Sequence, residues 1–274
     1  RQMCIRDRNN RVIGFGGSVM GDGEPKYLNS PETKLFDKSR NLYGLNYARL
    51  SREGYLLICE GYLDVISLHQ AGFTNAVASL GTAFTSQHAN VLKRYTDQVI
   101  LTYDSDGAGI KAALRAIPIL KEVGMSIKVL NMKPHKDPDE FIKQYGRDAF
   151  LRLLDQSENQ VDYRLEQIRK KYDLSDDSQK VGFLQEAAQL LSSLPSAVER
   201  EIYGRHAAET AGVSPEAVAQ EVKKAFQRRL RKEQKQQERR DLTPAIQFQP
   251  RARGVRYENI RSARAEEGVL RLIL

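Results

Sequence analysis

Hydrophobic and polar positions follow a regular alternation through the middle of the chain. Short apolar runs of strand length recur at residues 55–59, 76–80, 98–103 and 126–132. Between them, apolar residues return every three or four positions, as on one face of a helix, for example at Ile110, Ala113, Leu114, Ile117 and Leu120. Strands that alternate with helices at this spacing predict a parallel sheet with right-handed crossovers.

After about residue 151 the strand pattern ends and only helical periodicity continues. It predicts helices at residues 160–172, 177–194 and 197–212. Ser214 and Pro215 then supply the N-cap and the first-turn proline of a fourth helix. Residues 234–264 are polar, rich in Gln and Arg, and without periodicity, which is typical of a linker. The sequence therefore predicts an α/β region followed by a helical subdomain and a linker.

The N-terminal region is less regular. The first eight residues, RQMCIRDR, resemble no folded element, and we expect them to lie outside the native fold. Residues 11–20 alternate apolar residues with glycines, which predicts a short strand pair. Residues 21–33 are dense in Gly, Pro, Asn and Ser, and this composition predicts a loop.

The net charge of +8 over 274 residues is weak evidence about the function of the α/β region, because nearly all of it lies in one segment. Residues 223–240 hold nine Lys or Arg and two Glu, a net of +7, so the rest of the chain sums to about +1. A solvated basic helix and a nucleic-acid contact both remain open for this segment. The two cysteines form no CxxC pair, so no zinc site is expected. The cysteines also offer no disulfide framework, so we expect a reducing, cytoplasmic setting. Apolar runs are too short to span a membrane, so no membrane partner is expected.

Acidic residues follow three of the predicted strands. Glu60 follows the first run, Asp104 and Asp106 follow the third, and Asp137 and Asp139 lie just past the fourth. Ligands of open parallel sheets bind beyond the carboxyl ends of the strands, so these side chains should meet at one edge. Carboxylates without His or Cys favour a hard cation, Mg²⁺ or Mn²⁺. The pattern predicts a metal-dependent phosphoryl-transfer site suited to a two-metal mechanism, in which the ions steady the attacking and leaving oxygens.

The spacing of the acids and glycines at residues 104–109 supports a shared ion, although a simpler role for the acids is also open. Asp104 and Asp106 face the same side of an extended segment and can share an ion, while Gly107 and Gly109 should let the backbone turn sharply behind them. The alternative is that each acid only caps a helix N-terminus, where carboxylates are favoured. Acids at successive strand ends favour the metal site over this alternative.

The motifs DxDGxG (104–109) and EGxxD (60–64) together resemble the Toprim domain of primases, topoisomerases and some nucleases. Longer sequence motifs show that the chain resembles bacterial DnaG-type primases in particular, over about residues 11–225. These motifs are EPKYLNSPET, LYGLNYAR, CEGYLDVISLHQAG, AVASLGTA, YDSDGAGIKAALRA and KDPDEFI. The resemblance implies an α/β Toprim fold, with a parallel sheet flanked by helices, followed by an α-helical subdomain. It also implies synthesis of short RNA primers from NTPs on single-stranded DNA, with recruitment by a replicative helicase.

The resemblance also assigns roles to residues. Glu60 would act as a base or a metal ligand in nucleotidyl transfer, with Asp104, Asp106, Asp137 and Asp139 as metal ligands and Asp64 as a supporting acid. A basic loop beside the site would bind nucleotide or nucleic acid through Lys26, Tyr27, Asn29, Ser30, Lys34 and Lys38. Ser18 stands where the family usually carries an arginine, which puts one phosphate or template contact in doubt.

The domain organisation expected from pattern and resemblance has six parts. They are a non-native or disordered start at 1–10, a remnant of the N-terminal polymerase subdomain at 11–50, the Toprim catalytic domain at 51–150, a helical subdomain at 151–232, a linker at 233–262, and the truncated start of a helicase-binding domain at 263–274. A chain of this extent should initiate primers weakly or not at all by itself.

Other functions remain as alternatives to primer synthesis. A topoisomerase would need an activated tyrosine, and Tyr163, Tyr172 and Tyr203 lack such a context. A nuclease would differ mainly in what it releases. A DNA-binding Toprim protein without catalysis would not need acids at three strand ends.

Overall fold

The computed structural model describes residues 2–18 and 27–242. Arg1–Val222 form one compact unit, and Lys223–Leu274 belong to a second. No helix among the described residues is both long and apolar enough to cross a membrane.

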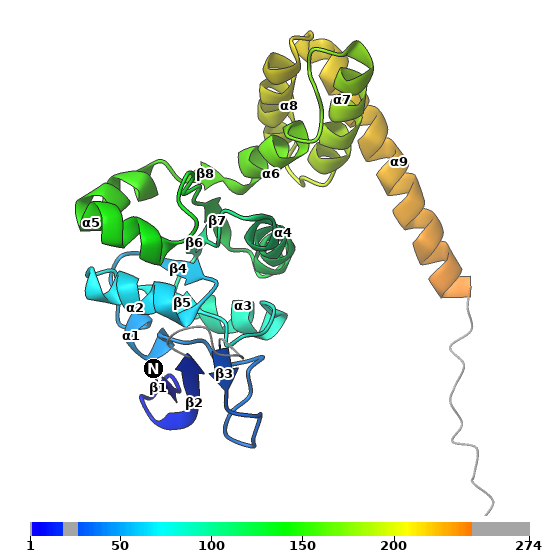
Figure 1. Ribbon diagram of the computed structural model, residues 1–274. Coiled ribbons are helices and arrows are strands. Elements are labelled where there is room, and N and C mark those ends of the chain that lie inside the picture. Colours follow the sequence, from blue (N-terminus) through cyan, green and yellow to red (C-terminus); the bar gives the residue numbers. More distant parts are fainter. Residues whose placement is uncertain (1, 19–26, 243–274) are drawn as a thin grey trace, which may run out of the picture. The chain divides into compact units, whose positions relative to one another are not determined.

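The larger unit is built on a five-stranded sheet in the order β5-β4-β6-β7-β8 (Figure 1). Its first four members are parallel: β5 (Ala76–Ala78), β4 (Tyr55–Cys59), β6 (Gln98–Thr102) and β7 (Ser126–Val129). The connecting helices are α2 (Tyr62–Gln70), α3 (Ser86–Leu92) and α4 (Gly107–Glu122), and α5 (Pro138–Asp155) follows β7. This confirms the predicted fold class, a parallel sheet flanked by helices.

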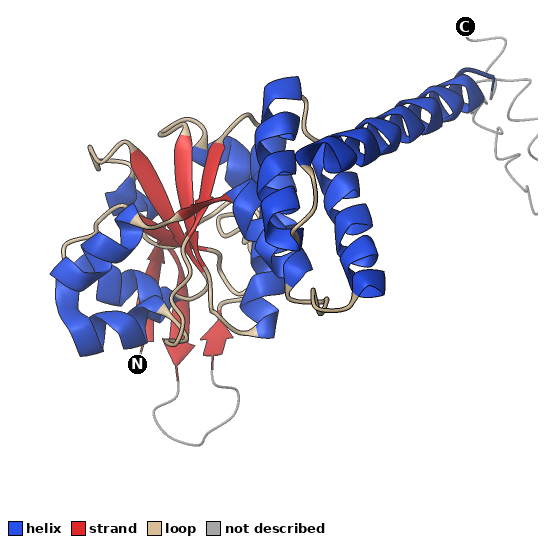
Figure 2. Cartoon of the chain, turned by 90° about the horizontal axis from the view of Figure 1, so that it is seen from above, coloured by secondary structure: helices blue, strands red, loops and turns tan. Residues whose placement is uncertain are grey.

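Both faces of the sheet are covered, which explains why the strands are continuous apolar runs rather than alternating ones. Figure 2 shows the strands between two sets of helices. Leu56 and Ile58 of β4 pack toward α3 and α4, whereas Leu57 and Cys59 pack toward α2 and α5. All four side chains are at most 3% exposed. The strand ends are therefore fixed by a core on each side.

The antiparallel strand β8 (Glu158–Asn159) closes the sheet beside β7, a pairing that the sequence pattern did not predict. Directly after β8, helix α6 (Gln160–Arg169) begins, with the side chain of Asn159 accepting from the Val161 amide at 2.9 Å. Tyr163 of α6 is buried in the same hydrophobic cluster as the α4 face of the sheet. The helical subdomain is thus joined to the five-stranded sheet by both a strand and a core residue.

A second, three-stranded sheet is formed near the N-terminus by β1 (Gln2–Arg6), β2 (Val12–Ser18) and β3 (Tyr27–Asn29). The structure differs here from the sequence analysis, which placed residues 1–10 outside the fold, residues 11–20 in a strand pair, and residues 27–29 in a loop. Ile5 is 1% exposed and packs against Phe36 and Leu80. This long-range packing and the pairing of β1 with β2 order a segment that shows no clear local pattern. The short helix α1 (Leu45–Ala48) follows this sheet.

Beyond α6, the chain continues as α7 (Asp177–Ser192), α8 (Ala197–Ala211) and α9 (Pro215–Leu242). The Ser214 hydroxyl accepts from the Ala217 amide at 3.4 Å, in keeping with its predicted N-cap role. Helix α9 runs ten residues past the predicted start of the linker at 233, because Lys, Arg, Gln and Glu are good helix formers even without an apolar face. The rest of that linker and the predicted segment 263–274 lie outside the described residues.

Candidate active site

The predicted acids are positioned by the ends of three parallel strands. Glu60 directly follows β4, and Asp104 lies two residues beyond β6. Asp106 and Asp137 are the N-cap residues of α4 and α5. The register of β4 with β6 and of β6 with β7 places these strand ends side by side. The sheet therefore gathers Glu60, Asp104, Asp106 and Asp137 at one edge.

Asp104 and Asp106 converge on a common point, which the ammonium group of Lys136 occupies. Lys136 Nζ lies 3.4 Å from Asp104 Oδ2 and 3.8 Å from Asp106 Oδ2. Burial raises the pKa of the Asp104 carboxyl, and the Lys136 charge opposes this rise. Lys136 was not singled out from the sequence. Its position directly before the DPD of KDPDEFI was the available signal.

The alternative role as helix caps also applies to two of these acids. Asp106 Oδ1 accepts from the amides of Ala108 and Gly109, both at 2.9 Å, and these hydrogen bonds lower the pKa of Asp106. Asp137 Oδ1 accepts from the Glu140 amide at 2.8 Å. In Asp106 the cap uses one oxygen, while the other faces Lys136. Capping thus fixes the carboxylate without removing its second oxygen from the site.

Glu60 lies at the exposed rim of this edge. Partial desolvation, followed by the charge of Asp104, raises the pKa of the Glu60 carboxyl, and Lys136 opposes the rise. A carboxylate with a raised pKa is a stronger base than a free one. Glu60 is therefore suited to accept a proton from a substrate hydroxyl.

Asp64, in the first turn of α2, and Asp139, in the first turn of α5, are less exposed than Glu60. Asp64 is 7% exposed, and its Oδ2 accepts from the Gly61 amide at 3.0 Å. Asp139 accepts from the Ser67 hydroxyl and pairs with Lys143 Nζ at 2.5 Å. The Asp64 bond thus stays within the first turn of α2, and the Ser67–Asp139 bond joins α2 to α5.

A preformed cage for a metal is not present in the part of the chain that the structure describes, since no three His, Cys, Asp or Glu side chains group closely enough to hold one ion. Magnesium does not require such a cage. It is commonly held by one or two carboxylates, with water and substrate phosphates completing its shell. The converging oxygens of Asp104 and Asp106 fit that requirement, and hard oxygen donors suit Mg²⁺ or Mn²⁺.

The two glycines of the DxDGxG motif have different roles. Neither has a positive φ, so the sharp turn expected behind the acids does not require left-handed backbone at Gly107 or Gly109. A Cβ at Gly109 would lie 2.2 Å from the Asp104 carbonyl oxygen, whereas one at Gly107 would meet nothing within 4 Å. Gly109 is needed because α4 begins in contact with the backbone of Asp104.

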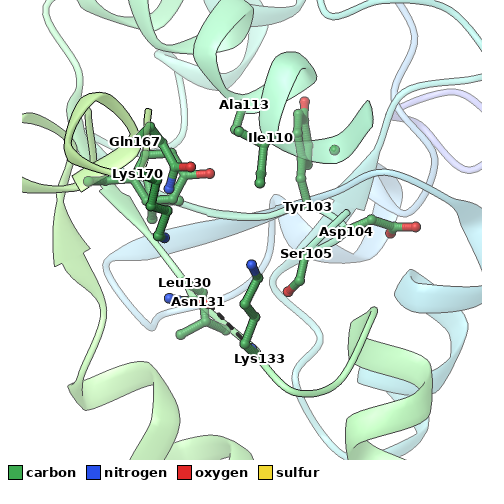
Figure 3. Close-up of a pocket in the computed structure, with 13 residues that line it drawn as sticks. Tyr103, Asp104, Ser105, Ile110, Ala113, Leu130, Asn131, Lys133, Gln167 and Lys170 are labelled. Carbon is green, nitrogen blue, oxygen red and sulfur yellow. Dashed lines mark hydrogen bonds between the residues drawn. The ribbon is translucent and has the colours of Figure 1, made fainter. Parts of the chain in front are cut away.

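A small cavity lies behind Asp104, between the end of β7, the start of α4 and α6 (Figure 3). In this view Lys133 extends toward the cavity, and Gln167 and Lys170 line its far side. The cavity volume of about 20 Å³ is enough for about one water molecule. A ligand larger than a water molecule therefore does not fit behind Asp104.

The predicted basic loop is only partly described. Lys26 and the side chains of Ser18 and Tyr27 lie outside the described residues. Asn29 donates to the Leu80 carbonyl at 3.2 Å and accepts from the Tyr62 hydroxyl at the start of α2. These bonds fasten β3 next to the loop that carries Glu60.

The remaining members of the predicted loop differ in their engagement. The Ser30 hydroxyl accepts from the Phe15 amide at 2.9 Å, so it serves the local structure. Lys34 is exposed. The Lys38 ammonium lies 6.0 Å from the centre of the Phe36 ring. No contact in the described residues joins Lys34 or Lys38 to the acids, and their binding role stays a prediction.

The buried acid Asp64 makes stability depend on pH. Burial, then the charge of Asp137, raises its pKa from 3.8 to about 7. Between these values the folded state binds more protons than the unfolded state, so the contribution of Asp64 to stability is greatest below pH 3.8 and falls as pH rises through about 7. We expect the metal-free protein to lose about 2 kcal/mol between pH 5 and 7.5 from this group. Asp64→Asn should remove that loss.

Urea unfolding in the presence of EDTA at several pH values measures this difference. Asp97→Asn is the control, because Asp97 is exposed and lies before β6, at the opposite end of the strand. Parallel stability curves for wild type and Asp64→Asn would contradict the raised pKa.

Three family models match successive parts of the chain. They are described as DNA primase catalytic core, N-terminal domain, over residues 2–49; Toprim-like, over 57–142; and DnaB-helicase binding domain of primase, over 161–216. The third lies in the helical subdomain, about a hundred residues before the segment at 263–274 where the sequence analysis placed the start of such a domain.

Individual relatives and solved structures are also DNA primases, and each is similar to most of this chain. A DNA primase of Clostridium acetobutylicum is 42% identical over 215 residues, which cover 78% of this chain and 36% of the relative. The crystal structure of a DNA primase domain from Pseudomonas aeruginosa matches with a TM-score of 0.66 and 36% identity, over 81% of this chain and 71% of that one. The DnaG primase catalytic domain bound to ssDNA matches with a TM-score of 0.66 and 35% identity, over 79% and 70%. The chain spans 31–39% of the length of the first curated relatives.

Proposed function

Because the chain belongs to the family of bacterial DNA primases, we propose that it carries the catalytic centre for RNA primer synthesis on a single-stranded DNA template. The reaction joins the 3′-hydroxyl of one ribonucleotide to the α-phosphate of an incoming NTP and releases pyrophosphate. The observation that carries the proposal is the convergence of Asp104 Oδ2 and Asp106 Oδ2 on the Lys136 ammonium beyond the end of β6. Two carboxylate oxygens that face one point could hold a divalent ion there, and such an ion would serve phosphoryl transfer.

Asp104 and Asp106 would hold the first Mg²⁺ or Mn²⁺, with Asp137 and Asp139 as candidates for a second. Such ions stabilise the negative charge that develops on the phosphate oxygens. Glu60 accepts the proton of the attacking hydroxyl, a role that its raised pKa favours. Asp64 supports the loop after β4 through its bond to the Gly61 amide.

The proposed partners follow from the family and from the matched segments. NTPs and single-stranded DNA are the substrates, with Lys26, Tyr27, Asn29, Ser30, Lys34 and Lys38 as candidate contacts on the basic loop. The match of residues 161–216 to the DnaB-helicase binding domain of primase supports a replicative helicase as partner. A cytoplasmic location is proposed on the same basis.

Extension of an RNA primer annealed to a DNA template tests the function directly. The chain is incubated with Mg²⁺ and labelled NTPs, and we expect slow addition of the nucleotide complementary to the template. Weak or absent initiation without a primer is also expected. Labelled nucleotides released from the DNA would instead support a nuclease. DNA binding without any nucleotide addition would support a non-catalytic Toprim protein.

Replacement of Glu60 by Gln tests the proposed base. Glutamine keeps the size of the side chain but cannot accept a proton, so we expect extension to slow by about a hundredfold or more. Affinity for single-stranded DNA, measured by fluorescence anisotropy, should stay within about twofold, because Glu60 is not part of the basic loop. Loss of DNA affinity in parallel with activity would show that Glu60 acts through folding or binding instead.

A further inference from the structure

Lys136 lies at the point where the site carboxylates converge, and neither the sequence motif nor the proposed mechanism gives it a role. Its ammonium is within 4 Å of both Asp104 and Asp106. Two carboxylates this close would raise one another's pKa and repel if no cation were near. In the protein without metal, Lys136 supplies that cation.

The backbone of Lys136 is held by two hydrogen bonds, whereas its side chain is held only by exposed ion pairs. Its carbonyl accepts from the Ser105 amide at 2.7 Å, within the loop that carries Asp104 and Asp106. Its amide donates to Glu140 Oε2 at 2.7 Å, in the first turn of α5. The side chain itself is 58% exposed. The ammonium, on a flexible four-carbon stem, can therefore leave the carboxylates while the loop stays in place.

We propose that Lys136 is a built-in counter-ion that competes with the divalent cation for Asp104 and Asp106. It holds the two acids together in the metal-free protein and raises the concentration of free cation needed to load the site. The inference rests on the proposed function, since it takes Asp104 and Asp106 to be metal ligands.

The relative strengths of the two interactions favour displacement. An exposed lysine–carboxylate pair contributes little to stability. A magnesium or manganese ion carries twice the charge and approaches carboxylate oxygens to about 2.1 Å, well inside the Lys136 distances. Lys136 is thus close enough to compete but too weakly held to exclude the ion.

Direct measurement of Mn²⁺ binding to the full chain tests the competition without relying on activity. Free Mn²⁺ is followed by electron paramagnetic resonance for wild type, Lys136→Met and Lys136→Arg. We expect Lys136→Met to bind Mn²⁺ about three- to tenfold more tightly, since it removes the competing charge. Lys136→Arg keeps the charge and should bind no more tightly than wild type.

Lys133→Met is the matched control, because Lys133 lies in the same loop but lines the cavity behind Asp104 (Figure 3). Its Mn²⁺ affinity should stay within about twofold of wild type, since bulk water screens charges that make no direct contact. Equal tightening in Lys133→Met and Lys136→Met would reveal a general charge effect and overturn the inference. Unchanged or weaker binding in Lys136→Met would overturn it as well.

Asp104→Asn separates failure of this inference from failure of the proposed metal site. If Asp104→Asn abolishes Mn²⁺ binding while Lys136→Met has no effect, only the role of Lys136 is refuted. If Asp104→Asn binds Mn²⁺ like wild type, the ion lies elsewhere and both proposals fail. Thermal unfolding in EDTA confirms that each variant folds, and Lys136→Gln replaces Lys136→Met if the latter does not.

Discussion

Replacement of Asp104 by Asn should lower the rate of template-directed primer extension at least about a thousandfold. Asp104 contributes one of the two carboxylate oxygens that converge at the end of β6. Asparagine has nearly the same shape but no negative charge, so the variant keeps the loop and loses the attraction for a divalent cation. Extension of a primed template at fixed Mg²⁺ measures the rate, and anisotropy with single-stranded DNA confirms that the template still binds.

Asp97→Asn is the control for this prediction. Asp97 precedes β6, at the end of the strand opposite Asp104, and its side chain is 89% exposed while paired with Lys93. Its replacement should change the extension rate by less than about twofold, since an exposed ion pair contributes little. Comparable losses in both variants, or unchanged activity in Asp104→Asn, would contradict the assignment of the site to the carboxyl end of the sheet.

Replacement of Gly109 by Ala should destabilise the protein by about 3 kcal/mol and distort the acidic loop. The added Cβ would lie 2.2 Å from the Asp104 carbonyl oxygen and 2.8 Å from its carbonyl carbon. Both are backbone atoms, which cannot move aside as a flexible side chain can. Relief requires α4 to shift away from the Asp104 loop, so activity should fall together with stability.

Gly107→Ala distinguishes steric contact from the general cost of replacing glycine. Gly107 is the first residue of α4, its φ is not positive, and a Cβ there meets nothing within 4 Å. Alanine has the higher helix propensity, so this variant should be as stable as wild type or more so by up to about 1 kcal/mol. Urea unfolding compares the two variants. Equal stabilities of Gly107→Ala and Gly109→Ala would refute the contact argument.

The sequence predicted those features that depend on local pattern. The apolar runs at β4, β6 and β7 are continuous because both faces of the sheet are buried, and that continuity is visible in the residues themselves. Once the strands are parallel, the acids that follow them must lie at one edge. The fold class and the grouping of Glu60, Asp104 and Asp106 therefore required no tertiary information.

Other features depend on contacts between distant residues. Strand β1 is ordered by its pairing with β2 and by the packing of Ile5 on Phe36 and Leu80. Neither contact can be predicted from residues 2–6 alone. The burial of Asp64 and the position of the Lys136 ammonium arise from how α2 and α5 meet the sheet. The requirement for Gly109 comes from the carbonyl of Asp104 rather than from its own backbone angles. Spacing alone could not reveal these distances.

The pairing of β8 with β7 decides where the chain could be cut without exposing the edge of the five-stranded sheet. If the chain were cut after Asp155, as a boundary near residue 150 suggests, β7 would become an open edge and its unpaired amides could recruit strands from other molecules. The cut would also remove Tyr163 and leave an apolar depression over α4. A piece that keeps β7 paired and this part of the core covered therefore extends through α6, so the helical subdomain begins before the packing of the sheet is complete.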